Sequence, residues 1–233
     1  FRKDLAADKN LEQLTREGIF SDCRKITGSK QSLTDDDFFL KELHSSEKWP
    51  AFLQTAVEKK RTIVICGETG SGKTVLTRAL LKSLHKDERV IILEDVHEVT
   101  VDHVVEAVYM MYGDAGKIGR VSATDALRAC MRLTPGRIIM TELRDDAAWD
   151  YLKALNTGHP GGVMSTHANS ARDAFNRIGL LIKATPIGRM LDMSDIMRML
   201  YSTIDVVVHM EKRKIKEIYF DPEYKMQCVN GSL

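Results

Sequence analysis

Short apolar runs alternate along the chain with segments in which apolar residues recur every three or four positions. An uninterrupted apolar run of four or five residues is typical of a buried strand, and the longer spacing is typical of an amphipathic helix. We expect strands over residues 62–66, 90–93, 137–141 and 163–166, and helices over 73–84, 103–112, 124–132, 145–156 and 170–182. Short buried strands alternating with helices pair in parallel, so the pattern predicts a three-layer α/β domain with a mostly parallel sheet.

The two ends of the chain depart from this alternation. Residues 1–50 are charged and irregular, with a predicted helix over 34–43, and we interpret them as a linker with docking helices that precedes a domain over 51–233. The acids at 35–37 suit the first turn of that helix, which favours helix capping over a metal site. Residues 205–209 and 216–220 predict a C-terminal antiparallel hairpin. Its basic turn, Lys212-Arg213-Lys214, is more typical of a solvated tip than of a functional site.

Composition narrows the class of protein further. The 233 residues are 43% apolar and carry 34 Lys plus Arg against 33 Asp plus Glu, a formal net charge of +1. That balance argues against global disorder and gives no chain-wide electrostatic footprint for nucleic acid. No apolar run approaches the ~20 residues that span a bilayer. The four cysteines form no CxxC pair, so they read as reduced thiols of a cytosolic protein without a zinc site.

A glycine-rich segment between the first strand and the following helix matches the pattern GxxxxGK[ST]. In that context the pattern is a phosphate-binding loop, or P-loop, because consecutive backbone N–H groups and the helix N-terminus face one phosphate chain. A chance glycine-rich turn is the alternative, and the complete match in the right context disfavours it. The segment consists of Gly67, Glu68, Thr69, Gly70, Ser71, Gly72, Lys73 and Thr74. We expect Lys73 to contact the β- and γ-phosphates and the Thr74 hydroxyl to bind Mg²⁺.

Carboxylates follow two further predicted strands. Glu94, Asp95 and Glu98 come after the strand at 90–93, and Glu142 comes after the strand at 137–141. Ligands of α/β folds bind beyond the carboxyl ends of the strands, so these acids are expected at the nucleotide. Glu98 is the candidate general base for water, and Glu142 has the reach for a water-mediated Mg²⁺ contact. For Glu94 and Asp95, capping of a turn or helix is an equally good interpretation, and Glu142 has the same alternative.

Two histidines flank the strand at 163–166. His167 follows the strand directly, where it would donate a hydrogen bond to a terminal phosphate. His159 lies in a Gly/Pro turn before the strand, and a structural role bonded to backbone is as good an interpretation as a functional one. No Cys or acid lies near either histidine in sequence, which disfavours a transition-metal site.

Four motifs in order resemble those of the bacterial secretion ATPases: GETGSGKT, ILEDVHE, ALRACMRLTPGRIIMTELRD and NTGHPGGVMSTHANSA. In that family they are the P-loop, the acidic box, a glutamate-type Walker B motif and the histidine box. The match covers about residues 50–210 and is most similar to the VirB-type traffic ATPases of type IV secretion and conjugation. A four-cysteine metal site seen in some pilus-assembly and type II secretion relatives is absent from the sequence, which favours the type IV branch.

The resemblance implies a RecA-like fold, a homohexameric ring and Mg²⁺-dependent ATP hydrolysis at subunit boundaries. It assigns the nucleotide lysine to Lys73, the catalytic acidic-box residue to Glu98, the Walker B acid to Glu142 and the phosphate-sensing residue to His167. Two arginines of the helix at 124–132, Arg128 and Arg132, match family arginines that are charge partners of the nucleotide site or contacts between subunits. Their alternative is a solvated helix face.

The chain also departs from the family pattern. Pro135-Gly136 stands where Pro-Asp is common, and Thr141 stands before the Walker B acid where Gly is common. A side chain at 141 changes how that strand end approaches the nucleotide. The chain begins at Phe1, and the P-loop begins only at Gly67, so we expect a separate N-terminal domain of the family to be absent from these residues.

The resemblance further implies a bacterial cytoplasmic protein bound peripherally to the inner membrane. Its expected partners are other secretion ATPases and inner-membrane channel proteins, while contact with nucleic acid is left open. An ATP-gated docking module, which binds ATP only to recruit other ATPases, is one competing function. A RecA-type nucleic-acid translocase is another, and a small-molecule kinase is a weaker one, because nothing in the sequence resembles an acceptor site.

Overall fold

The computed structural model describes residues 11–19, 21, 30–113, 121–144 and 147–231, and the chain divides into two units, residues 1–31 and 32–233. The first unit contains the short helix α1 (Leu11–Arg16). The second begins before the domain start predicted at residue 51, because α2 (Asp35–Ser45) buries Leu40 and Leu43 in the same core cluster as the helix that follows it. Asp37 and Thr34 form a reciprocal cap at the start of α2, as expected for its acidic first turn.

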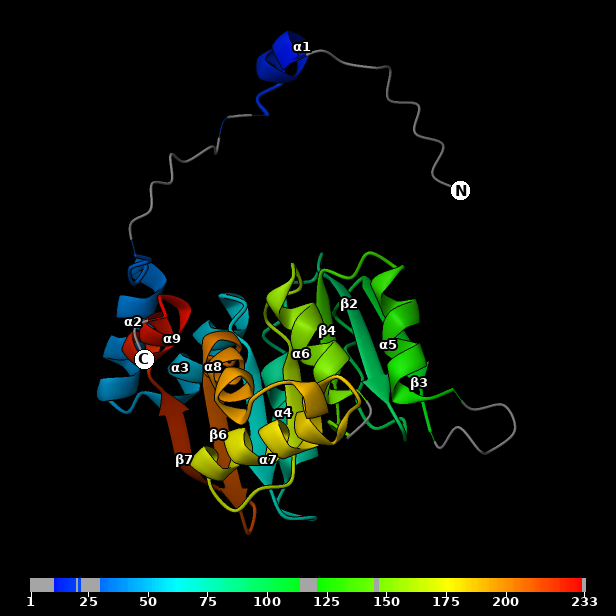
Figure 1. Ribbon diagram of the computed structural model, residues 1–233, viewed down its shortest axis with the longest axis vertical. Helices are drawn as coiled ribbons and strands as arrows, with labels where there is room; N and C mark the ends of the chain where they lie inside the picture. Colours follow the sequence, from blue (N-terminus) through cyan, green and yellow to red (C-terminus); the bar gives the residue numbers. More distant parts are fainter. Residues whose placement is uncertain (1–10, 20, 22–29, 114–120, 145–146, 232–233) are drawn as a thin grey trace. The chain divides into compact units, whose positions relative to one another are not determined.

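A seven-stranded sheet crosses the second unit in the order β3-β2-β4-β5-β1-β6-β7. The first six strands are parallel to their neighbours, and β7 is antiparallel to β6, so the predicted parallel sheet and the predicted hairpin are both confirmed (Figure 1). The strands are β1 (Ile63–Gly67), β2 (Arg89–Glu94), β3 (Glu106–Met111), β4 (Arg137–Met140), β5 (Val163–Thr166), β6 (Val206–Glu211) and β7 (Lys214–Phe220).

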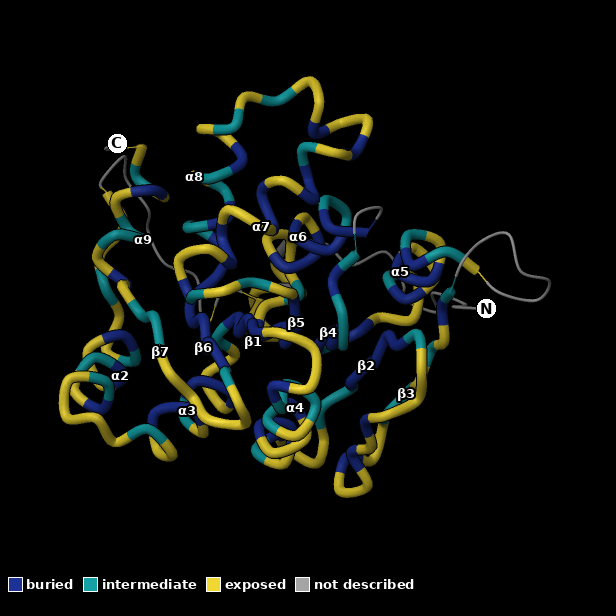
Figure 2. The backbone as a smooth tube through the Cα atoms, turned by 90° about the horizontal axis from the view of Figure 1, so that it is seen from below, coloured by how far each residue is buried: buried dark blue, intermediate teal, exposed yellow. Residues whose placement is uncertain are grey.

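Helices cover both faces of this sheet, as Figure 2 shows. The helices are α3 (Trp49–Glu58), α4 (Lys73–Leu81), α5 (Ala123–Met131), α6 (Ala148–Asn156), α7 (Ala171–Ala184), α8 (Met193–Thr203) and α9 (Pro222–Val229). One core cluster joins the sheet to α2, α3 and α4, and a second joins its other face to α5, α6, α7 and α8. Successive residues of one strand go to opposite clusters, as Ile63 and Val64 do, which is the period-two pattern of a strand buried on both faces.

The helix predicted over 103–112 is wrong, because this segment forms the edge strand β3. Its apolar residues also fit a period of two: Val108, Met110 and Tyr112 pack on one cluster and Ala107 on the other. Main-chain pairing with β2, in a register that places Val108 beside Ile91, decides between the two periods. Two helices, α8 and α9, were not predicted at all.

A buried arginine lies at the amino ends of the parallel strands, opposite the edge of the sheet where the strands have their carboxyl ends. Arg137, the first residue of β4, is fully buried. Its guanidinium donates to Glu88 Oε2 at 3.0 Å and to the carbonyl oxygens of Val57 and Gly161 at 3.0 and 3.2 Å. Burial by itself raises the pKa of Glu88, but the hydrogen bond and charge of Arg137 outweigh burial and lower it. The buried charge is therefore fully partnered.

We expect Arg137→Met to lower the free energy of unfolding by about 3 to 5 kcal/mol, because it removes the buried cation that donates to Glu88 and to the carbonyl oxygens of Val57 and Gly161. Urea denaturation of the variant and the wild type measures this. The control is Arg198→Met, which removes an exposed ion pair with Asp195 and should cost under about 1 kcal/mol. Equal losses in the two variants would contradict the structural role of Arg137.

Candidate active site: a P-loop cleft at the strand ends

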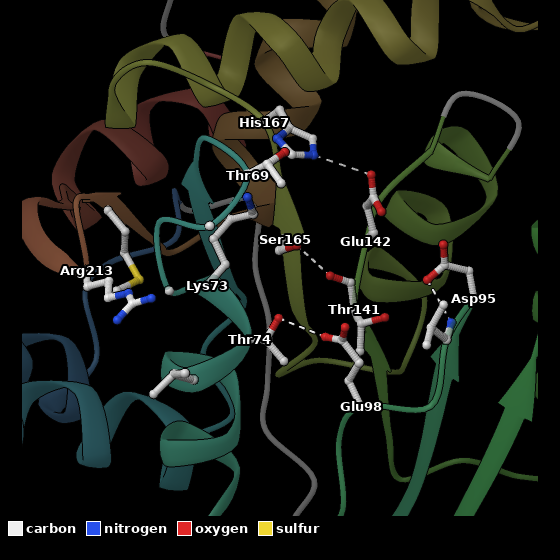
Figure 3. A pocket seen from close by; sticks show the side chains of 15 residues that line it. Thr69, Lys73, Thr74, Asp95, Glu98, Thr141, Glu142, Ser165, His167 and Arg213 are labelled. Carbon is white, nitrogen blue, oxygen red and sulfur yellow. Dashed lines mark hydrogen bonds and ion pairs between the residues drawn. The ribbon is translucent and has the colours of Figure 1, made fainter.

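A cleft of about 800 Å³ lies at the carboxyl ends of the central strands (Figure 3). It collects residues from the P-loop, from the segment after β2, from the ends of β4 and β5, and from the β6–β7 hairpin. The lining residues are Thr69, Gly70, Gly72, Lys73, Thr74, Val75, Asp95, Val96, Glu98, Thr141, Glu142, Ser165, His167, Met210 and Arg213. The structure therefore brings residues from the ends of all four of these predicted strands to one cleft.

The backbone of the P-loop depends on glycine at two positions in particular. Gly67, at the end of β1, approaches β6 so closely that a Cβ there would lie 2.2 Å from the Met210 carbonyl oxygen. Gly72, the N-cap of α4, has φ +99°, a left-handed conformation that other residues adopt only with strain. These glycines let the loop turn between strand and helix and direct its N–H groups toward one volume.

The lysine and threonine that end the P-loop motif both lie in the cleft. Lys73 Nζ donates to the carbonyl oxygens of Gly67 and Glu68 at 2.8 and 2.9 Å. Partial burial lowers the pKa of Lys73, and the nearby carboxylate of Glu142 acts in the opposite direction. The Thr74 hydroxyl donates to Glu98 Oε2 at 3.0 Å, which joins the P-loop directly to the segment that follows β2.

A fully buried carboxylate at the end of β2 shapes that segment. Glu94 Oε1 accepts hydrogen bonds from the backbone N–H groups of Glu98 and Val99, at 3.1 and 3.0 Å. Glu94 Oε2 lies 2.9 Å from His97 Nδ1. Glu94 therefore does not line the cleft, and its contacts instead fix the loop that carries the exposed Glu98.

The acid at the end of β4 lies beside a histidine and an arginine. Glu142 Oε1 is 3.5 Å from His167 Nε2, and Glu142 Oε2 is 3.4 Å from Arg144 Nη2. The same Arg144 nitrogen pairs with Asp95, so Asp95 and Glu142 share one cation. The backbone at Glu142 is held as well, because the Tyr112 hydroxyl donates to its carbonyl oxygen at 2.9 Å. Figure 3 shows Glu142 and His167 directed toward each other.

The structure does not bring the remaining candidates to the cleft. Arg128 of α5 is exposed and pairs with Asp125 and Asp150, at 3.8 and 3.6 Å. Arg132, at the end of the same helix, is exposed too. His159 Nδ1 lies 2.9 Å from the Pro135 carbonyl oxygen, which fits the structural interpretation of that turn.

Some cleft residues were missed by the sequence analysis. Arg213 was taken for part of a solvated hairpin tip, and Met210 was not singled out, yet both line the cleft. Ser165 lies there too and donates to the Thr141 carbonyl oxygen. Pairing of β6 beside β1 is what brings Met210 and Arg213 to the P-loop, and no local motif carries that information.

At Gly136, an added Cβ would lie 3.2 Å from the Arg89 carbonyl oxygen, so the family's common Asp fits poorly there.

The donor set of the cleft suits a hard cation that retains most of its water. The hydroxyl of Thr74 and the carboxylate of Glu98 lie within hydrogen-bond distance, and Glu142 lines the same cleft. Such oxygen ligands fit Mg²⁺, which commonly binds through one or two protein groups and substrate phosphates. Within the described part of the chain, no three His, Cys, Asp or Glu side chains are grouped to hold a metal by themselves. Cys66, Cys130 and Cys228 are buried free thiols, and Cys23 lies outside the described residues.

Comparison with known proteins decides the family. Residues 29–217 match the type II/IV secretion system protein family. The chain belongs to that family. It is 34% identical to the type IV secretion system protein VirB11 of Bartonella quintana, over 99% of this chain and 68% of that protein. It is 35% identical to VirB11 of Brucella suis, over 96% of this chain and 64% of that protein.

A solved structure extends the likeness to three dimensions. The VirB11 ATPase of the Brucella suis type IV secretion system, in complex with sulphate, superposes with a TM-score of 0.89 at 34% identity. The match covers 98% of this chain and 67% of that one, so the chain spans about two thirds of the relatives that it matches. The predicted RecA-like fold and the resemblance to VirB-type ATPases are both confirmed. In the described residues, no helix combines the length and apolarity that crossing a membrane requires.

We expect Glu94→Ala to release the loop that carries Glu98, because two backbone N–H groups lose a charged acceptor. Hydrogen exchange at the amides of Glu98 and Val99 should accelerate at least about tenfold, and the free energy of unfolding should fall by about 2 to 4 kcal/mol. Glu94→Gln is the matched control, since it keeps the Oε1 acceptor and should have a smaller effect on both amides. Unchanged exchange in Glu94→Ala would contradict the positioning role.

Proposed function

We propose that the chain binds ATP with Mg²⁺ and hydrolyses it, and that this reaction drives a ring-shaped secretion motor. The observation that carries the proposal is a cleft lined both by P-loop residues, among them Lys73 and Thr74, and by Glu98, Glu142 and His167. A cleft built only to hold a nucleotide needs the P-loop alone. Two carboxylates and a histidine around the same volume supply the groups that move a proton and stabilise charge during phosphoryl transfer.

Binding is proposed to begin at the P-loop. The N–H groups of residues 67–74 surround the phosphate chain, and Lys73 exchanges its carbonyl partners for the β- and γ-phosphates. The Thr74 hydroxyl and, through water, Glu142 are the protein ligands that would hold Mg²⁺. When bound, the cation would supply positive charge that offsets the charge of the phosphates during phosphoryl transfer.

Hydrolysis is proposed to use Glu98 as the general base. Its carboxylate accepts a proton from a water molecule whose oxygen bonds to the γ-phosphorus, while the bond from phosphorus to the β–γ bridging oxygen breaks. The bond from Thr74 to Glu98 shows how near that carboxylate lies to the end of the P-loop. His167, whose Nε2 lies 3.5 Å from Glu142 Oε1, would donate a hydrogen bond to the γ-phosphate. Loss of that phosphate would then change the contacts of the segment after β5.

The wider assembly is proposed from the family. VirB11 relatives are named as type IV secretion system proteins, which supports a role for this chain in secretion, conjugative transfer or pilus assembly. We infer a homohexamer that works in the bacterial cytoplasm at the inner membrane, with other secretion ATPases and channel proteins as partners. The exposed Arg128 and Arg132 are available for contacts between subunits in such a ring.

We expect Lys73→Ala and Glu98→Gln to lower the rate of phosphate release from Mg-ATP by at least about a hundredfold each. Lys73→Ala should also abolish ATP binding, while Glu98→Gln should retain it, because only the first removes a phosphate contact. Phosphate release and nucleotide binding by the purified assembly measure both effects. The controls are Lys212→Ala and Glu106→Gln, which make the same charge changes at exposed positions and should leave the rate unchanged.

Wild-type turnover that persists in both variants would overturn the proposed chemistry. ATP binding without hydrolysis, combined with transport that survives Glu142→Gln, would instead support the ATP-gated docking module. Chelation of Mg²⁺ by EDTA should stop turnover in the wild type, and turnover that is indifferent to EDTA would remove the cation from the mechanism.

A further inference from the structure

The cleft has a second end that the proposed hydrolysis does not use. Figure 3 shows Lys73 between Arg213 on one side and Glu142 with His167 on the other. Arg213 belongs to the turn of the β6–β7 hairpin, and it lines the cleft together with Met210 of β6 and Val75 of α4. These residues have no part in proton transfer, so their chemistry must be explained separately.

The hairpin turn is fixed against the P-loop by its backbone. The N–H group of Arg213 donates to the Ser71 carbonyl oxygen at 3.1 Å. A Cβ at Gly72 would lie 3.3 Å from the Met210 methyl carbon and 3.6 Å from the Arg213 Cα. Lys212 and Arg213 have φ of +48° and +62°, a conformation rare for residues other than glycine. The tight turn thus places Arg213, which is exposed, beside the phosphate loop, where it lines the cleft.

The two adjacent basic residues of this turn differ in their surroundings. Lys212 is 86% exposed and pairs with Glu211 beside it. The Arg213 guanidinium has no carboxylate within ion-pair distance among the residues that the structure describes. A cation that lines a cleft without an acidic partner suits an anionic ligand, and guanidinium geometry suits phosphate oxygens in particular.

Apolar surface lies next to this cation. Val75, the residue after the P-loop threonine, is 69% exposed although it lies in the first turn of a helix against the core. The Met210 side chain, which is 6% exposed, lines the same cleft, and thioether and methyl groups make favourable contacts with aromatic rings. This end of the cleft therefore combines a phosphate-binding cation with a surface for a flat ring.

We propose that the Met210–Arg213 turn is the nucleoside end of the site, and that Arg213 binds the α-phosphate and ribose of the nucleotide while Met210 and Val75 contact its base. This inference rests on the proposed function. Lys73, Glu142 and His167 define where the γ-phosphate lies, so the α-phosphate of the same nucleotide must lie toward the opposite end. The only described cation at that end of the lining is Arg213.

Arg213→Ala tests the inference, because it keeps the backbone N–H that bonds Ser71 and removes only the guanidinium. We expect the Kd for Mg-ATP and the KM to rise at least about tenfold, with kcat within about threefold of wild type. Arg213→Lys should recover part of the affinity. Lys212→Ala, the matched loss of one positive charge in the same turn, should change the Kd by less than twofold. Thermal unfolding of Arg213→Ala without nucleotide should match the wild type.

The outcomes separate this inference from the proposed function. Wild type that neither binds nor hydrolyses ATP would overturn the proposed function itself. Wild type that does both, with Arg213→Ala indistinguishable from Lys212→Ala, would overturn the inference alone. A fall in kcat at unchanged KM would also contradict it, since Arg213 would then act at the reacting end of the cleft. Lower thermal stability of the nucleotide-free variant would assign Arg213 a structural role instead.

Discussion

Parallel strand pairing is the constraint on which the rest of this structure depends. Cys66 of β1 lies beside Thr166 of β5 and His209 of β6, and Leu93 of β2 lies beside Met140 of β4. When parallel strands end at the same level, the residues that follow them lie together at one edge of the sheet. The P-loop, the loop of Glu98, the acid Glu142 and the histidine His167 therefore converge without being near one another in sequence.

Two supports keep this edge in shape. The buried Glu94 carboxylate accepts hydrogen bonds from the backbone N–H groups of the loop, and this holds the exposed Glu98 beside Thr74. On the other side of the P-loop, the β6–β7 hairpin approaches Gly67, where a side chain would not fit, and Gly72, whose positive φ favours glycine. That hairpin also holds the histidine segment, because Glu217 of β7 accepts from the backbone N–H of Ala171 at the start of α7 at 2.7 Å. The reacting groups are thus positioned by neighbours that take no part in the chemistry.

Much of this arrangement could be predicted from the sequence, and the exceptions have physical causes. Strongly apolar strands and the P-loop carry their own local pattern, so β1, β2, β4 and β5 were predicted correctly with the helices between them. The edge strand β3 was predicted as a helix, since its half-buried residues fit both periods and only pairing with β2 decides. Glu94 could not be separated from Glu98 as a buried support, because burial depends on how the segment folds back on itself. Arg213 was misread since its place in the cleft follows from β6 lying beside β1, a contact between distant parts of the chain.

The account is tested most directly by a crystal structure of the protein with Mg²⁺ and a non-hydrolysable ATP analogue. It predicts the terminal phosphate between Lys73 and His167, the Thr74 hydroxyl at the cation, and the nucleoside at Met210 and Arg213. A phosphate chain bound outside residues 67–74, or a nucleotide bound in the reverse direction with its base beside His167, would contradict it.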